Sequence, residues 1–198
     1  MSVESTTVSV ALAERSHEIR IGSDNLADIG RWVKSIGDIS RAIVITDTNV
    51  HQLYGETVLR TLSSIDIDII TVPAGEASKS IPMYDKILNQ MLAKQVDRKS
   101  LVLALGGGVV GDLAGFAAAT FGRGIRFLQI PTTLLATVDS SVGGKVGVNL
   151  SGAKNMVGAF WQPQGVLIDV NVLQRLPERD YRAGLAEVVK YGVIQDAK

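Results

Sequence analysis

The stretch Leu101–Gly111, LVLALGGGVVG, decides the fold of this chain. Its first half is an apolar run typical of a strand that is buried on both faces, and the small residues at 113–120, LAGFAAAT, are typical of a helix packed closely on a sheet. Between them Gly106, Gly108 and Gly111 match G-x-G-x-x-G, in which glycines permit a tight turn, the approach of backbone amides to a pyrophosphate, and close helix packing. The pattern predicts a helix N-terminus that faces an anion. A glycine-rich turn without a ligand is the alternative.

Four further apolar runs of the same kind surround this unit. They lie at 42–46, 67–72, 127–130 and 165–168. Stretches of helical period separate them, and the clearest carries Tyr84, Ile87, Leu88, Met91 and Leu92. Strands that alternate with helices favour right-handed crossovers. We therefore predict a Rossmann-like α/β fold, with a mainly parallel sheet, helices on both of its faces, and ligands beyond the carboxyl ends of the strands.

Both ends of the sequence depart from this alternation. Residues 6–12 and 18–21 alternate apolar and polar side chains around a polar turn, which predicts a β-hairpin with one buried face. A helix capped at 23–24 and ended by Gly37 is expected to follow. A last helix at 178–194 has no further layer to cover it, so we expect a dimer contact there or a shortened protein.

Composition and charge exclude several classes of protein. The 198 residues include 20 Lys and Arg, 20 Asp and Glu and no cysteine, which excludes a disulfide-stabilised secreted module. A net charge of zero argues against general binding to nucleic acid or to a membrane surface. We recognise neither a signal peptide nor a stretch of the roughly 20 apolar residues that span a bilayer. We therefore expect a cytoplasmic protein without nucleic-acid or membrane partners.

Polar residues follow three of the predicted strands. They are Asp47 and Asn49, then Gly75, Glu76 and Lys79, and finally Thr132 and Thr133. Because the carboxyl ends of parallel strands meet at one edge, these residues are candidates for one binding site. No acidic residue follows Gly111 at the spacing of about 20 residues seen in dinucleotide-binding folds, so Asp47 and Asn49 are the candidates for a ribose. A turn with a helix cap and a loop salt bridge are the alternatives.

The tract 121–160 carries a local excess of positive charge. It contains Arg123, Arg126, Lys145 and Lys154, with Asp139 as its one acidic residue. An anionic ligand that carries phosphate or carboxylate would account for this excess, and solvated surface lysines are the alternative. The sequence around GGK lacks the first glycine and the Ser or Thr of a P-loop, which argues against a triphosphate hydrolase.

Four long motifs occur in the order LGGGVVGDLAGFAAATF, QIPTTLLATVDSSVGGKVGVN, KNMVGAFWQP and GLAEVVKYGVI. In this combination the chain closely resembles the 3-dehydroquinate synthases, from the hairpin to its last residue. The resemblance implies an NAD-binding α/β domain over 1–176. It also implies that 177–198 form the first helix of a truncated, mostly helical metal-binding domain.

The resemblance assigns residues to cofactor, substrate and metal. The implied NAD site contains the seven strand-end residues above together with Gly107, Gly108, Val109, Val110, Gly111, Asp112, Asp139, Lys145 and Lys154. The implied catalytic and substrate-binding residues are Arg123, Asp139, Lys145, Asn155 and Lys190. Glu187 is implied as the first ligand of a zinc or cobalt ion, whereas the i, i+3 spacing alone favours an ion pair of Glu187 with Lys190.

The activity implied is the conversion of 3-deoxy-D-arabino-heptulosonate 7-phosphate, a phosphorylated sugar acid, to 3-dehydroquinate and phosphate in the shikimate pathway, by a homodimer when full-length. A catalytic metal of this kind needs three protein ligands, and the two histidines, His17 and His51, lie outside the family's metal motifs. We therefore expect an inactive N-terminal fragment that retains an NAD site. A sister sugar-phosphate cyclase of secondary metabolism and a non-catalytic NAD-binding module are the alternatives.

Overall fold

The computed structural model describes residues 5–195, which form a seven-stranded sheet with the order β1-β2-β9-β6-β5-β3-β4. In that order the strands are Thr6–Val10, His17–Gly22, Gly165–Asp169, Arg126–Pro131, Leu101–Gly106, Ala42–Asp47 and Ile67–Val72. Only β1 is antiparallel to its neighbour, and all other pairs in the sheet are parallel. The mainly parallel α/β fold and all five predicted apolar strands are confirmed.

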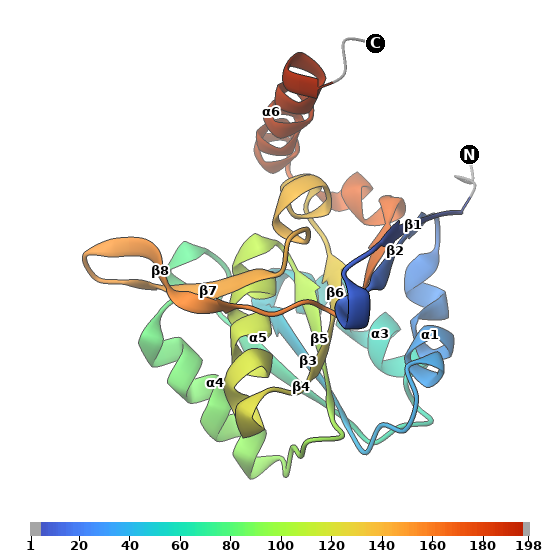
Figure 1. Ribbon diagram of the computed structural model, residues 1–198, viewed down its shortest axis with the longest axis vertical. Helices are drawn as coiled ribbons and strands as arrows, with labels where there is room; N and C mark the ends of the chain where they lie inside the picture. The colour runs from blue at the N-terminus through green and yellow to red at the C-terminus, as the bar shows by residue number, and fades with distance from the viewer. Residues whose placement is uncertain (1–4, 196–198) are drawn as a thin grey trace.

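Two helices cover each face of the sheet, α1 and α3 on one side and α4 and α5 on the other (Figure 1). Their bounds are Ile29–Ser35, Glu56–Thr61, Ile81–Ala93 and Gly108–Thr120. Alternate side chains of β3 enter the two cores, Ile43 and Ile45 toward α4 and α5, and Val44 toward α1 and α3. Of the predicted stripe on α4, Ile87 is fully buried, whereas Leu92 is 67% exposed.

Short helical turns connect these elements. They are Ala13–Arg15, Asn25–Asp28, α2 at Thr48–Val50, His51–Gly55, Glu76–Ser78, Phe121–Arg123, Ala136–Ser140 and Val170–Arg175. The turn at Asn25–Asp28 corrects the predicted helix cap, because Asp24 has a φ of 60° and makes no side-chain cap. Instead the carboxylate of Asp169, at the end of β9, accepts the N–H groups of Asp24 and Leu26 at 3.1 and 3.0 Å. The turn at Asn25–Asp28 is therefore capped by Asp169, a residue far away in the sequence.

The N-terminal hairpin forms as predicted but is only partly buried. Its second strand, β2, joins the main sheet beside β9 and buries Ile19. Its first strand, β1, lies at the edge of the sheet, where Val8 is 46% exposed. The expected buried face is therefore confined to β2.

A second hairpin, β7 (Lys145–Leu150) and β8 (Ala153–Phe160), lies outside the main sheet and across α5 (Figure 1). The sequence analysis predicts no strand in this region. Val146 and Val148 of β7 are buried against α5, and a Cβ on Gly115 of α5 would lie 2.4 Å from Val146 Cγ1. This close packing holds the hairpin against the middle of α5.

The last helix, α6 (Glu178–Gln195), extends away from the body of the molecule (Figure 1). It touches the body where Gly184 meets Leu134, since a Cβ there would lie 2.6 Å from Leu134 Cβ. Farther along, Val189 and Val193 are 63% and 82% exposed. None of the helices within residues 5–195 is both long and apolar enough to cross a membrane.

Candidate functional site

A cavity of about 760 Å³ lies between the first turn of α5, the turn Glu76–Ser78 and the β7–β8 hairpin. Its lining brings together the predicted residues Glu76, Lys79, Gly108, Val109, Asp112, Asp139, Lys145, Lys154 and Asn155. The carboxyl edge of the sheet and the hairpin thus contribute to one site. The order of strands and helices predicts the contribution of the sheet edge, whereas it does not predict that of the hairpin.

Close packing surrounds the first and third glycines of the motif, Gly106 at the end of β5 and Gly111 on α5. A Cβ on Gly106 would lie 2.6 Å from Val110 Cβ, and one on Gly111 would lie 3.3 Å from Gln129 Nε2 of β6. The N-cap residue, Gly107, has no side chain with which to cap the helix. The first amides of α5 therefore keep their hydrogen-bonding capacity for an anionic ligand.

A buried cation forms the floor of the cavity. Lys79 is only 6% exposed, and its Nζ donates hydrogen bonds to Asp112 Oδ2 and, at 2.5 Å, to Asn155 Oδ1. Burial raises the pKa of Asp112, against the opposing effects of the Lys79 hydrogen bond and charge. An ammonium has three donors, so these two bonds leave one for a ligand.

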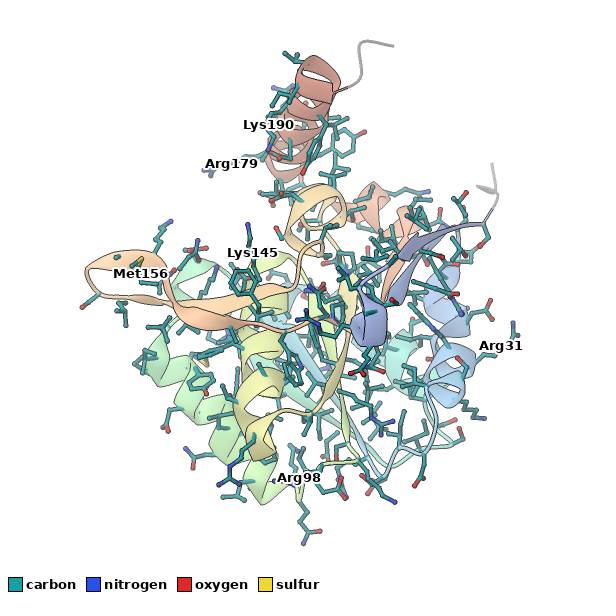
Figure 2. The ribbon with its side chains drawn as sticks, in the orientation of Figure 1. Arg31, Arg98, Lys145, Met156, Arg179 and Lys190 are labelled. Atoms are coloured by element: carbon teal, nitrogen blue, oxygen red, sulfur yellow. The ribbon has the colours of Figure 1, made fainter. Side chains whose placement is uncertain are left out.

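The upper wall of the cavity is cationic and apolar. Lys145 projects from β7 toward the end of the molecule that carries α6 (Figure 2), and Lys154 Nζ lies 3.7 Å from Glu76 Oε1. Met156 and Phe160 of β8 are 69% and 72% exposed and also line the cavity. Neither Met156 nor Phe160 is among the residues predicted from the sequence. The signal that would find them is the period of two that places them on the same side of a strand as Lys154.

Other predicted cofactor residues lie at neighbouring strand ends. Asp47 caps α2, with its Oδ1 accepting the N–H groups of Asn49 and Val50 at 2.9 and 3.0 Å, so the helix-cap interpretation of Asp47 is confirmed. Thr133 Oγ1 accepts the N–H of Ala136 at 3.2 Å. Thr132 Oγ1 is buried and has no hydrogen-bond partner within residues 5–195. This unpaired hydroxyl and the side-chain-free turn beside it fit a dinucleotide.

Gly75, Gly107 and Val110 complete the set of cofactor positions. Gly75 has a φ of 107°, which favours glycine, and begins the turn that carries Glu76 and Lys79. A Cβ on Gly107 would lie 3.0 Å from Thr133 Cγ2. Val110 is buried behind the first turn of α5, so it shapes the turn and its side chain does not line the cavity.

The predicted residues of α6 lie beside the cavity and do not line it. Lys190 Nζ donates to Glu187 Oε1, which confirms the ion pair and raises the pKa of Lys190. Tyr191 OH lies 3.4 Å from Asp139 Oδ1, and partial desolvation together with the Asp139 charge raises the pKa of Tyr191. The pair of Tyr191 and Asp139 links α6 to the body.

The described residues do not form a metal centre. Within residues 5–195 no three His, Cys, Asp or Glu side chains come together as a ligand set. His17 Nδ1 lies 3.2 Å from Arg15 O, and His51 Nδ1 lies 2.8 Å from Thr71 Oγ1. Glu187 alone does not satisfy the three protein ligands of a catalytic zinc.

The predicted excess of cations in the tract 121–160 is divided between two ends of the molecule. Arg123 ends the turn Phe121–Arg123, which follows the C-terminus of α5 and lies about 20 Å, the length of that helix, from the first turn. Arg126 Nη2 donates to the carbonyls of Asp38 and Lys99 at 2.6 and 2.5 Å. The structure therefore does not bring Arg123 to the cavity, and Lys145 and Lys154 supply its positive charge.

Solved structures of two related cyclases share this architecture. A 2-deoxy-scyllo-inosose synthase complexed with carbaglucose-6-phosphate, NAD+ and Co2+ is 29% identical, with a TM-score of 0.87 over 93% of this chain and 51% of that one. The 2-epi-5-epi-valiolone synthase ValA from Streptomyces hygroscopicus subsp. jinggangensis, with NAD+ and Zn2+ bound, is 32% identical, with a TM-score of 0.84 over 95% of this chain and 52% of that one.

Sequence comparison points to one family. A 3-dehydroquinate synthase of Rhodopirellula baltica is 50% identical over 97% of this chain, and one of Picosynechococcus sp. is 47% identical over 96%. The chain spans about half the length of these relatives, 53% in both cases. The family model described as "3-dehydroquinate synthase N-terminal" matches residues 69–183. Since this match covers more than half of the sequence, the chain belongs to the 3-dehydroquinate synthase family.

Proposed function

We propose that this chain is the NAD-binding part of a cytoplasmic 3-dehydroquinate synthase. The complete enzyme would convert 3-deoxy-D-arabino-heptulosonate 7-phosphate to 3-dehydroquinate and phosphate in the shikimate pathway. The observation that carries the proposal is the single cavity in which the open first turn of α5 meets Lys79, Lys145 and Lys154. Such a cavity suits a ligand with several anionic groups.

The residues present fit NAD. The amides at Gly108 and Val109 would receive its pyrophosphate, Lys79 would contribute its remaining donor, and Asp47 and Asn49 would hold the adenosine ribose. When bound, NAD would accept a hydride from a substrate alcohol and later return it, so that it is not consumed overall. The part of the chain itself is to orient the dinucleotide across the edge of the sheet.

The same cavity would bind the phosphorylated sugar acid. Lys145 and Lys154 supply charge for its carboxylate or phosphate, and Asn155 supplies an amide for its hydroxyls. Asp139 lies at the α6 side of the cavity and would lie where nicotinamide and substrate meet. The assignments of Lys190 and Arg123 to the substrate stay predictions, since neither lines the cavity.

We further propose that residues 1–176 are the NAD-binding domain and that 177–198 begin a second, helical domain. Glu187 would be the first ligand of a divalent metal, with the other ligands supplied by the additional length that the relatives have. No step of a mechanism is assigned to a metal on the residues described here. The complete enzyme is expected to be a homodimer.

Calorimetric titration of NAD into the purified chain tests the first half of the proposal. We expect one molecule of NAD per chain, and a crystal soaked with NAD should show it along the first turn of α5. NAD at any other edge of the sheet would contradict the proposal. Zinc titrated into the same chain should bind weakly, and tight binding lost in Glu187→Ala would contradict the account of the metal.

A test of the proposed catalytic activity needs the complete enzyme. Release of phosphate together with 3-dehydroquinate as the carbocyclic product would support the proposed activity. A different cyclitol would favour a sister sugar-phosphate cyclase, as the similarity to 2-deoxy-scyllo-inosose synthase suggests. Retention of NAD with no turnover of any sugar phosphate would favour a non-catalytic NAD-binding module.

A further inference from the structure

Asn149 makes hydrogen bonds in three directions at the end of β7. Its N–H donates to the carbonyl of Lys79 at 2.9 Å, and its Nδ2 donates to Glu76 Oε1 at 2.8 Å. Its Oδ1 accepts the N–H of Asn155 at 2.9 Å. Asn149 itself does not line the cavity, but each of its three partners does.

The position of Asn149 in the hairpin explains these bonds. The pairing of β7 with β8 shifts register between Val148 and Leu150, so Asn149 lies at an irregularity of the ladder. Such irregularities redirect a residue away from its own strand pair. Asn149 instead forms a bridge with Ser80, beside the turn that carries Glu76 and Lys79.

The bond to Asn155 constrains a backbone that is otherwise unfavourable. Asn155 has a φ of 57°, a left-handed conformation that residues with a Cβ adopt infrequently and that Asn tolerates best among them. In this conformation its Oδ1 lies 2.5 Å from Lys79 Nζ, on the floor of the cavity. Asn149 therefore holds both ends of this contact, Asn155 through its side-chain oxygen and Lys79 through its main chain.

We propose that Asn149 is a positioning residue for the NAD site, which holds Glu76, Lys79 and Asn155 in the arrangement that receives the dinucleotide. The inference rests on the proposed function. It goes beyond that function because it assigns a role to a side chain outside the cavity. It predicts that NAD affinity depends on the hydrogen bonds of Asn149, a residue that does not contact NAD.

The test compares two substitutions in the 198-residue chain. Asn149→Asp keeps the acceptor for Asn155 but places a second carboxylate against Glu76, and Asn149→Ala removes both side-chain bonds. For each, we expect the Kd for NAD, measured by calorimetry, to rise about tenfold. Hydrogen exchange at the Asn155 amide should accelerate in Asn149→Ala and stay close to wild type in Asn149→Asp.

Repeating Asn149→Asp in a Glu76→Gln variant separates the loss of positioning from the effect of the added charge on NAD affinity. There the new carboxylate at position 149 can accept a hydrogen bond from the glutamine amide, so Asn149→Asp should raise the Kd much less than it does beside Glu76. A loss of equal size in both backgrounds would mean that the added charge alone acts on NAD and would overturn the proposal. The matched control is Asn89→Asp on the exposed side of α4, where Nδ2 donates to Asp85 O at 2.9 Å. This control should bind NAD as the wild type does.

The remaining outcomes are also decisive. Wild-type affinity in a folded Asn149→Ala or Asn149→Asp would overturn the positioning role while leaving the proposed function intact. If Asn149→Ala fails to fold, the test uses Asn149→Asp, alone and combined with Glu76→Gln. If the wild-type chain does not bind NAD, the proposed function fails, and the positioning role fails with it.

Discussion

Two lysine–carboxylate pairs flank the proposed site, and they differ in how they are held. Lys79 pairs with Asp112 on the cavity floor, where the two side chains are 7% and 22% exposed. Lys190 pairs with Glu187 on α6, where the two side chains are 48% and 17% exposed. The first pair joins residues 33 positions apart, whereas the second joins residues within one turn of a helix.

This difference shows which part of the site is preformed. The floor pair depends on the parallel sheet, since Lys79 follows β4, Asp112 lies on α5, and Asn155 comes from the β7–β8 hairpin. The pair on α6 needs only the helix itself. The cavity floor is therefore fixed by tertiary structure, whereas the pair on α6 is a local arrangement on an exposed helix.

The largest expected effect comes from breaking the floor pair with Lys79→Met. This change leaves the Asp112 carboxylate buried without its cation, which should lower the free energy of unfolding by about 2 to 4 kcal/mol. The Kd for NAD should rise about a hundredfold, because a buried charged donor is lost. Urea denaturation and calorimetry measure the two quantities.

The double variant Lys79→Met with Asp112→Asn separates these two effects. With both charges removed, most of the lost stability should return, whereas NAD affinity should stay low. Unchanged NAD affinity in Lys79→Met would show that the floor is a structural ion pair without a binding role.

The residues of the cavity floor show how much of the site could be predicted from the sequence. The buried strands were predictable because each is an apolar run bounded by turns, and a parallel sheet then brings Lys79 and Asp112 to one edge. The β7–β8 hairpin was not predictable in the same way, because Gly147 and Gly158 lie opposite each other in its antiparallel ladder. A Cβ on Gly158 would lie 2.1 Å from Val146 O, so the glycines that break a strand pattern are required by the close approach.

In this hairpin Lys145, Lys154 and Asn155 were predicted as site residues through the family resemblance, whereas its other contacts were not predicted. Asn149 and the β8 residues Met156 and Phe160 enter the site only through the hairpin, and no local pattern connects them to Lys79. The Asp169 cap on Asp24 is similar, because its partners lie 145 residues apart. Arg123 shares a tract of sequence with Lys145 and Lys154, yet the structure does not bring it to the same cavity, so its assignment to the substrate stays a prediction.

A smaller effect on NAD affinity is expected from Gly108→Ala, at the first residue of α5. The new methyl group would lie 3.0 Å from Ser140 Oγ, on the cavity wall, and should raise the Kd for NAD about tenfold by obstructing the amides. The free energy of unfolding should change by less than about 1 kcal/mol, since alanine favours the helix and offsets the crowding. Gly152→Ala is the matched control, because its Cβ would meet nothing within 4 Å. Equal affinity of the two variants would contradict binding at this turn.

The contributions of Asp112 and Asp68 to stability should change with pH in opposite directions. Asp112 lies on the cavity floor, and Asp68 pairs with Arg41 and Lys94. Burial raises the pKa of Asp112, so its contribution to stability is greatest at low pH and is lost as the pH rises from the ordinary value of about 3.9 through the raised pKa. The hydrogen bond from Lys94 and the nearby Arg41 lower the pKa of Asp68, whose contribution is lost as the pH falls through that lowered pKa. Carbon-13 NMR titration of the carboxyl groups measures both. Titration of Asp112 at or below the pKa of Asp68 would mean that the Lys79 hydrogen bond and charge outweigh desolvation, and would contradict the predicted rise.

The smallest effect is expected on α6. Lys190→Met and Glu187→Gln break a pair that the rest of the fold does not use, so the Tm of the chain should hardly move. NAD affinity should also stay within about twofold of wild type, because neither residue lines the cavity. Lys190→Met is the direct counterpart of Lys79→Met, with the same substitution at the same kind of pair. If it weakened NAD binding as strongly as Lys79→Met, α6 would have to close over the dinucleotide in solution, and the contrast between a preformed floor and a local pair on α6 would be wrong.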